Sequence, residues 1–146
     1  MRQPHRHCLA VVLSLCLAAA SPSTPRATSP AQATELDGTW VGQYSEAEGQ
    51  RRDFKPGEVR MVFQGNQARA TGIVSPDEAT LGVEVNPRTT PRQLDYWISP
   101  DGSKTLCVYE VAGDTLRIGV PRSGGRPTAI SSAKGSRTVV LVLKRQ

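Results

Sequence analysis

From about residue 34 onward, where a folding pattern begins, this 146-residue chain contains no histidine, because both of its histidines, His5 and His7, lie near the start. Their absence from the rest excludes a Ser–His–Asp or Cys–His catalytic arrangement and a metal site built on imidazole nitrogens. We therefore predict no catalytic residue, no bound metal and no cofactor. An enzyme built on two carboxylates stays open, since glycoside hydrolysis needs only such a pair, but no spacing of acidic residues points to one.

Cysteine and long apolar runs are equally scarce. Cys8 and Cys16 lie within the first 20 residues, so Cys107 is alone in the remainder and can form no internal disulfide. The apolar run at residues 8–20 has 13 residues, fewer than the roughly 20 that cross a bilayer, and we predict no stable membrane span. Two arginines precede this run and small residues follow it, an order that predicts a secretory signal peptide.

Export leaves more than one processing route open. Cleavage after Ala20 or after Ala33 fits the small residues at both places, and we favour Ala33 because it directly precedes the folding pattern. Lipidation at Cys16 is an alternative that we disfavour, because Leu15 stands where a small residue is expected. We predict a signal peptide with a disordered Pro/Ser/Thr/Ala-rich segment at residues 1–33. One folded domain, residues 34–146, would then be exported to the periplasm or beyond.

The positive charge of the chain is concentrated at its start. The formal net charge is +5, but residues 1–33 carry three of the 18 basic side chains and none of the 13 acidic ones. The remaining 15 basic and 13 acidic side chains leave a net charge of only +2. Nucleic-acid binding needs a dense basic face, so we predict no nucleic-acid partner.

From residue 36 onward the sequence has the features of β-structure. Alternating apolar and polar residues predict strands at residues 39–44, 59–63, 68–74, 80–85, 93–98, 105–111, 115–120 and 137–144. Gly65-Asn66 and Gly113-Asp114 suit tight hairpin turns. Antiparallel strands connected in order form a meander, and pairing the first strand with the last removes its exposed edges. We predict an all-β fold, a single antiparallel meander barrel of about eight strands.

Four short motifs occur in an order that resembles a known family. They are Leu36-Asp37-Gly38-Thr39-Trp40, Tyr109-Glu110-Val111 followed by Gly113-Asp114-Thr115-Leu116, Arg126-Pro127-Thr128, and Leu141-Val142-Leu143-Lys144-Arg145. Together they resemble the small lipocalin-like domain abundant in Planctomycetes, over residues 36–146. The resemblance implies an exported lipocalin-like barrel whose role is uncharacterised, and it carries over no catalytic residue.

The first and last strands hold the residues expected to close the barrel. Gly38 and Trp40 match the Gly-x-Trp motif on the first strand of lipocalins, and Arg145 matches the basic residue that packs over that tryptophan. A guanidinium stacked on an indole and hydrogen-bonded to nearby carbonyls would close one end of the barrel. The chain is shorter than true lipocalins and shows no long helix after the barrel.

The candidate ligand-binding residues are three tyrosines. Alternation assigns Tyr44, Tyr96 and Tyr109, together with Cys107, to the interior. The three rings could line a pocket for a small apolar or amphipathic molecule. The alternative is a barrel filled by these rings, which would act as a protein-interaction or envelope-structural module.

Two long loops are further candidates for function. Residues 45–56 correspond to the loop that covers the cup in lipocalins, so the resemblance implies a lid. Residues 121–136 are rich in glycine, serine and proline and carry Arg122, Arg126 and Lys134, which could contact an anionic partner. Solvated surface charge is the alternative for both loops.

Overall fold

The computed structural model describes residues 34–99 and 101–146, so the predicted signal peptide and both cleavage positions lie outside the described residues. Within these two ranges the chain forms nine strands and no helix, and accordingly none that could cross a membrane. The strands are β1 (Gly38–Ala47), β2 (Gln50–Asp53), β3 (Arg60–Gln64), β4 (Gln67–Thr71), β5 (Ala79–Asn86), β6 (Arg92–Trp97), β7 (Thr105–Ala112), β8 (Thr115–Pro121) and β9 (Thr138–Arg145).

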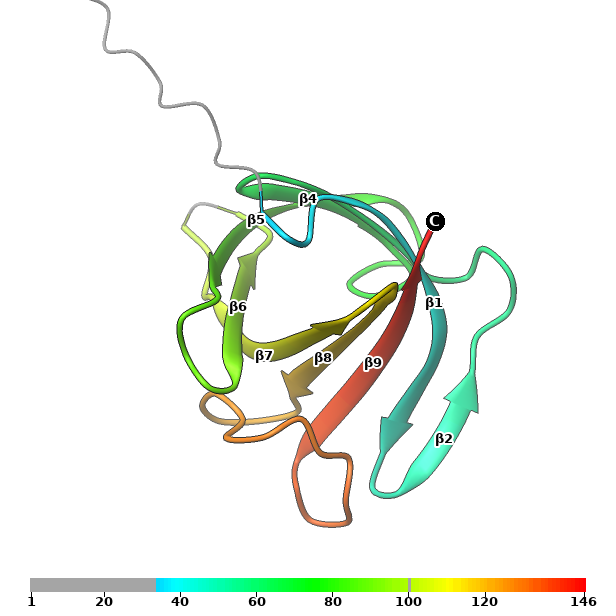
Figure 1. Cartoon of the computed structure of the whole chain (residues 1–146), viewed down its shortest axis with the longest axis vertical. Helices are drawn as coiled ribbons and strands as arrows, with labels where there is room; N and C mark the ends of the chain where they lie inside the picture. The colour runs from blue at the N-terminus through cyan, green and yellow to red at the C-terminus, as the bar shows by residue number, and fades with distance from the viewer. Residues whose placement is uncertain (1–33, 100) are drawn as a thin grey trace, which may run out of the picture.

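Eight of these strands form a closed antiparallel barrel (Figure 1). The hydrogen-bonded order runs from β1 through β3, β4, β5, β6, β7 and β8 to β9, and β9 returns to pair with β1. The remaining strand, β2, pairs with β1 alone and lies outside the barrel wall. The prediction of an all-β, closed meander of about eight strands is therefore confirmed.

The centre of the barrel is packed with apolar side chains. Alternation in β3 shows how they arise, since Met61 and Phe63 are buried while Arg60 and Gln64 are exposed. The buried residues form one continuous core with exposed fractions of 9% or less. Because water reaches so little of their surface from any side, these side chains enclose a packed interior rather than a hollow cup.

Residues 45–56, the predicted lid, are mainly a β-hairpin. β1 continues to Ala47, and a two-residue turn at Glu48 and Gly49 leads into β2. Both turn residues have positive φ, 54° and 76°, as a type I′ hairpin turn requires. The prediction missed this hairpin because its usual sequence signal is Asn-Gly or Asp-Gly, and here a glutamate takes the first position.

The two ends of the barrel differ. β1 begins and β9 ends at one of them, the closed end, and residues 34–37, which we call the N-terminal plug, lie across it. The opposite end, the far end, carries the β1–β2 hairpin and residues 72–78 between β4 and β5. Residues 122–137, which connect β8 to β9, also start from the far end.

Candidate functional site

The N-terminal plug is held by Trp40 of β1 and by the turn between β3 and β4. Leu36 is completely buried in the core. Its carbonyl accepts a 2.7 Å hydrogen bond from Nε1 of Trp40. Asp37 accepts a 3.0 Å bond from the backbone N–H of Gly65, in the turn between β3 and β4. The plug therefore closes one end of the barrel with an apolar side chain and satisfied backbone groups.

The structure brings the three predicted closure residues together at this end. Trp40 and Arg145 are direct partners between β1 and β9, and the Arg145 guanidinium carbon lies 4.1 Å from the centre of the Trp40 ring. The guanidinium donates hydrogen bonds of 2.7 Å to the carbonyl of Asp37 and 2.8 Å to the carbonyl of Glu35. Gly38 has φ of +118°, and a Cβ there would lie 3.1 Å from Nη1 of Arg145. Glycine thus leaves room for the guanidinium to reach the plug.

Tyr109 also belongs to the closed end. It is buried, and its hydroxyl donates a 2.6 Å hydrogen bond to the Glu35 carboxylate. Arg92 donates to the same carboxylate at 2.9 and 3.0 Å. Burial, followed by the Glu35 contact, raises the pKa of Tyr109 well above its ordinary value. The phenol therefore serves as a fixed hydrogen-bond donor to the plug.

The assignment of Tyr44 to the interior is wrong. The register between β1 and β9 shifts between Gly42 and Tyr44, so Gln43 is an extra residue, a β-bulge. Beyond the bulge, Tyr44 pairs with Val142, which lies outside the core, instead of sharing the face of Trp40 and Gly42. The guanidinium of Arg51, on β2, stacks on the exposed side of Tyr44 at 3.6 Å.

Tyr96 packs against the core toward the far end, beside Val83 and Thr105. Burial raises the pKa of its hydroxyl, and the neighbouring Thr105 opposes that effect. The three tyrosines thus occupy three separate places, with Tyr44 outside, Tyr109 at the closed end and Tyr96 toward the far end. They do not line one cavity.

Cys107 points into the core and is completely buried. Burial, and then the nearby Asp95 carboxylate, raise the pKa of its thiol to about 12. The thiolate is the nucleophilic form of cysteine. At neutral pH the thiol therefore stays protonated and acts as a small apolar side chain.

We expect Cys107 to react with a maleimide only after the protein unfolds. At pH 8 a thiol with a pKa near 12 is ionised in only about one molecule in 10,000, and burial blocks the reagent as well. Mass spectrometry at successive times measures the labelling. A variant with Cys107→Ala and Ser103→Cys, in which the cysteine is exposed, should react at once. Equally rapid labelling of the native wild-type protein would contradict the inward orientation.

Residues 122–137, which we call the outer strap, cross the outside of the barrel. Both terminal nitrogens of Arg126 bind the Asp95 carboxylate, at 2.6 and 2.8 Å, and one of them also donates to the carbonyl of Cys107 at 2.7 Å. Further along, Ser132 accepts a 2.7 Å backbone bond from Gly49 and donates a 3.1 Å bond to Glu46. The strap is therefore anchored to β6 at one end and to the β1–β2 hairpin at the other.

The strap explains why the last strand is apolar on both faces. Val108, Gly119 and Val140 form one row across β7, β8 and β9 on the outside of the barrel, and both valines are completely buried. A Cβ at Gly119 would lie 3.8 Å from the carbonyl oxygen of Ala129 in the strap. Arg126 is one of the cations predicted to contact an anionic partner, but it forms an ion pair with Asp95 of its own chain.

Breaking the strap anchor should loosen this segment. We expect Asp95→Asn to lower the free energy of unfolding by about 1.5–3 kcal/mol, the range for hydrogen bonds to charged groups. Hydrogen exchange of residues 122–137 should rise at the same time. Glu110→Gln is the matched control, because Arg117 and Glu110 are also 2.6 Å apart but form a much more exposed pair. That change should cost less than about 1 kcal/mol. Unchanged exchange in the Asp95→Asn strap would contradict the anchoring role.

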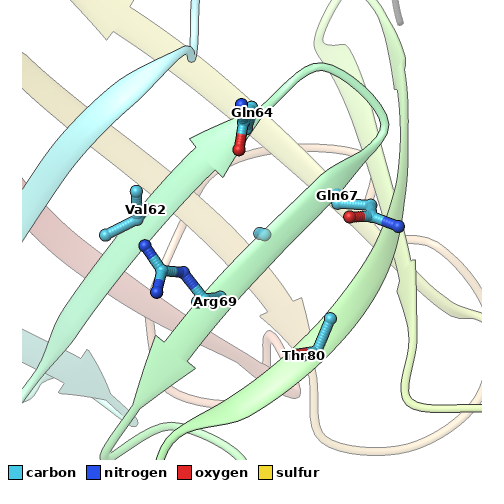
Figure 2. Close-up of a pocket in the computed structure, with 6 residues that line it drawn as sticks. Val62, Gln64, Gln67, Arg69 and Thr80 are labelled. Atoms are coloured by element: carbon cyan, nitrogen blue, oxygen red, sulfur yellow. The ribbon is translucent and has the colours of Figure 1, made fainter.

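A shallow pocket of about 140 Å³ lies on the outer face of β3, β4 and β5 (Figure 2). We call the side chains around it the outer cradle: Val62, Gln64, Gln67, Arg69 and Thr80. Figure 2 shows Arg69 extending from β4 toward Val62 on β3. Two amides, a hydroxyl and a guanidinium surround an aliphatic floor, a set that can bind a polar ligand from the solvent side.

The outer cradle and the strap anchor were not found from the sequence. The alternation that marks a strand also marks its outward residues as merely polar, so it does not distinguish a solvated face from a binding face. Asp95 and Arg126 are far apart in the chain, and no local pattern links them. Within residues 34–99 and 101–146, no group of three or more His, Cys, Asp or Glu residues could hold a metal ion.

Comparison with known proteins does not identify a relative of this chain. No family model, no curated protein and no solved structure matches it.

Proposed function

We propose that this chain is an exported, non-enzymatic binding module that contacts its partners through the outside of a filled barrel. This proposal rests on the packed interior of the barrel. Core side chains from the barrel strands and the plug leave almost no reachable surface inside, and a barrel of eight strands is small enough for side chains to fill. Partners would then be recognised on the surface, as in a protein-interaction or envelope-structural module.

The chemistry of the side chains supports a non-enzymatic role. The domain from residue 34 onward has no histidine to act as a general base near neutral pH. The raised pKa of buried Cys107 favours its thiol form, which is a poor nucleophile. The short apolar run at residues 8–20, after two arginines, supports export.

Binding of a small apolar or amphipathic molecule at the far end is a second candidate. Phe54, Ile73, Val74 and Tyr96 are only partly buried where they pack against the core. A groove of about 480 Å³ adjoins Ile73 and Val74. Its volume falls within the range of about 300–1,000 Å³ that is usual for small-molecule sites.

A brominated fatty acid distinguishes the two candidates, because bromine quenches tryptophan fluorescence on contact. In a Trp97→Phe background, Tyr96→Trp places a reporter toward the far end, while Trp40 reports on the interior. Tyr44→Trp in the same background is the matched control for adsorption to the outside. A filled module predicts no saturable quenching beyond that control. Saturable quenching that is greater in the Tyr96→Trp protein than in the Tyr44→Trp protein would overturn the filled-module proposal in favour of ligand binding.

A further inference from the structure

The register of β3 to β6 places a tryptophan beside the outer cradle. Gln64 pairs with Gln67 between β3 and β4. Gln67 in turn pairs with Gly82, and Gly82 pairs with Trp97. Residues directly opposite each other in a sheet share a face, so these four residues form one row across the outside of the barrel.

Gly82 is the gap in this row that the indole fills. A Cβ at Gly82 would overlap the Trp97 ring, so the indole lies over the glycine backbone. Covering the glycine stabilises the sheet. It also brings the aromatic ring up to Gln67, at the edge of the outer cradle. The Lys104 amine lies over the half-buried ring, 4.9 Å from its centre, but this side chain is 46% exposed in a surface ion pair with Glu84, so a sugar ring can displace it at low cost.

A second row runs directly beside the first and carries the positive charge. It contains Val62, Arg69 and Thr80, which are successive partners across β3, β4 and β5. Arg69 contacts Glu78 at 3.7 Å, and both side chains are more than half exposed, at 58% and 52%. Such a long, solvated ion pair contributes little energy. An incoming carboxylate can therefore replace Glu78 at low cost.

We propose that this face binds an acidic polysaccharide, with Arg69 holding the carboxylate of a uronic acid unit and Trp97 stacking on a neighbouring sugar ring. A guanidinium binds carboxylates through two parallel hydrogen bonds. The amides and the hydroxyl of the cradle can bond to sugar hydroxyls. The C–H face of a pyranose packs on the electron-rich face of an indole.

The dimensions favour a polymer over a single sugar. Neighbouring strands lie about 4.8 Å apart, so Gln64 on β3 and the indole over Gly82 on β5, two strands apart, are separated by about 10 Å. That span is longer than one sugar ring. The 140 Å³ pocket is also too small to enclose a drug-sized molecule. Binding strength would come from several units of one chain engaging the face together.

The position of the cradle in the sheet disfavours other macromolecules. β4 is hydrogen-bonded to β3 on one side and to β5 on the other, so an extended peptide cannot add to it as a strand. A duplex nucleic acid carries one charge about every 1.7 Å and is bound through many phosphates. A uronic acid polymer carries one carboxylate per sugar unit, which suits a cradle with one arginine. This inference rests on the proposed function, since it assigns a partner to the outside of the barrel.

Affinity electrophoresis of the exported protein through gels containing polygalacturonate tests the proposal, with dextran as the neutral polymer. We expect polygalacturonate to retard the protein and dextran to leave it unaffected. Arg69→Gln should weaken the interaction by about tenfold, as expected for losing a charged hydrogen-bonding partner, and Trp97→Phe should weaken it less. Arg117→Gln, the same charge change on β8, should bind as the wild type does. Arg69→Gln and Arg117→Gln should keep the wild-type melting temperature.

Three results would overturn the inference. The first is no retardation by polygalacturonate, and the second is equal retardation by dextran. The third is an equal loss in Arg69→Gln and Arg117→Gln, which would show general charge attraction. If the fatty-acid assay also detects no ligand inside the barrel, any of these results removes the polysaccharide and leaves the filled surface-binding module in place.

Discussion

Trp40→Ala should lower the free energy of unfolding by about 3–5 kcal/mol, the usual cost of emptying a buried tryptophan site. Trp40 is completely buried, and its ring supports the Arg145 guanidinium on one side. Its Nε1 holds the carbonyl of Leu36 in the plug. The change would therefore create a cavity and weaken the closed end at once. Chemical denaturation followed by circular dichroism measures the loss.

Trp40→Phe separates the two contributions. Phenylalanine keeps most of the apolar volume and a ring for Arg145, but it cannot donate to Leu36. The buried carbonyl would lose this hydrogen bond, at a cost of about 1–3 kcal/mol. Hydrogen exchange should increase in residues 34–37 more than in the distant strand β5. A Trp40→Ala protein that melts within a degree of wild type would contradict any closing role for Trp40 and Arg145.

Gly72→Ala should be the second most damaging change, because two effects add at this position. Gly72 has φ of +75°, a conformation that costs an L-residue about 1–2 kcal/mol. A Cβ there would also overlap the carbonyl oxygen of Glu58, and overpacking of this kind typically costs about 1–3 kcal/mol more. The sum is about 2–5 kcal/mol. Moving Glu58 would disturb its neighbour Val59, whose carbonyl accepts a 2.9 Å bond from Gly42.

Gly57→Ala provides a matched control for the backbone term. Its φ is +78°, nearly that of Gly72, yet no atom lies within 4 Å of the position that a Cβ would occupy. The control should therefore lose only about 1–2 kcal/mol. The difference between the two variants in denaturant unfolding measures the steric effect of Glu58 alone. Equal losses would show that the loop between β2 and β3 yields freely to the new methyl group.

The strand pattern was predictable because its causes are local. Alternation of apolar and polar residues puts Met61 and Phe63 inside β3 whatever the rest of the chain does. Glycine adopts the positive φ of a hairpin turn without steric strain, whatever distant residues do. Gly65 and Gly113 show this, with φ of 61° each. Closure of β1 on β9 was predictable for a related reason, since open edges of a meander have to be paired or protected.

The predicted interior position of Tyr44 is wrong because a single extra residue changed the register. Alternation extended from Trp40 along β1 assigns Tyr44 to the interior. The bulge at Gln43 instead turns the side chain of every later residue of β1 to the opposite face of the sheet. No residue type in that segment signals a bulge. Tyr109 was correctly placed inside, yet its bond to Glu35, 74 positions away, depends on how the plug lies across the barrel end.

The amino-acid sequence alone specified an all-β chain, its strand order and the pairing of its ends, because periodicity and turn chemistry act over a few residues. Only the tertiary structure decided which surface is available for function. The Asp95–Arg126 anchor, the strap over Val108, and the row from Gln64 to Trp97 all join residues that are distant in the chain. Register and closure bring them together, and both are properties of the whole sheet.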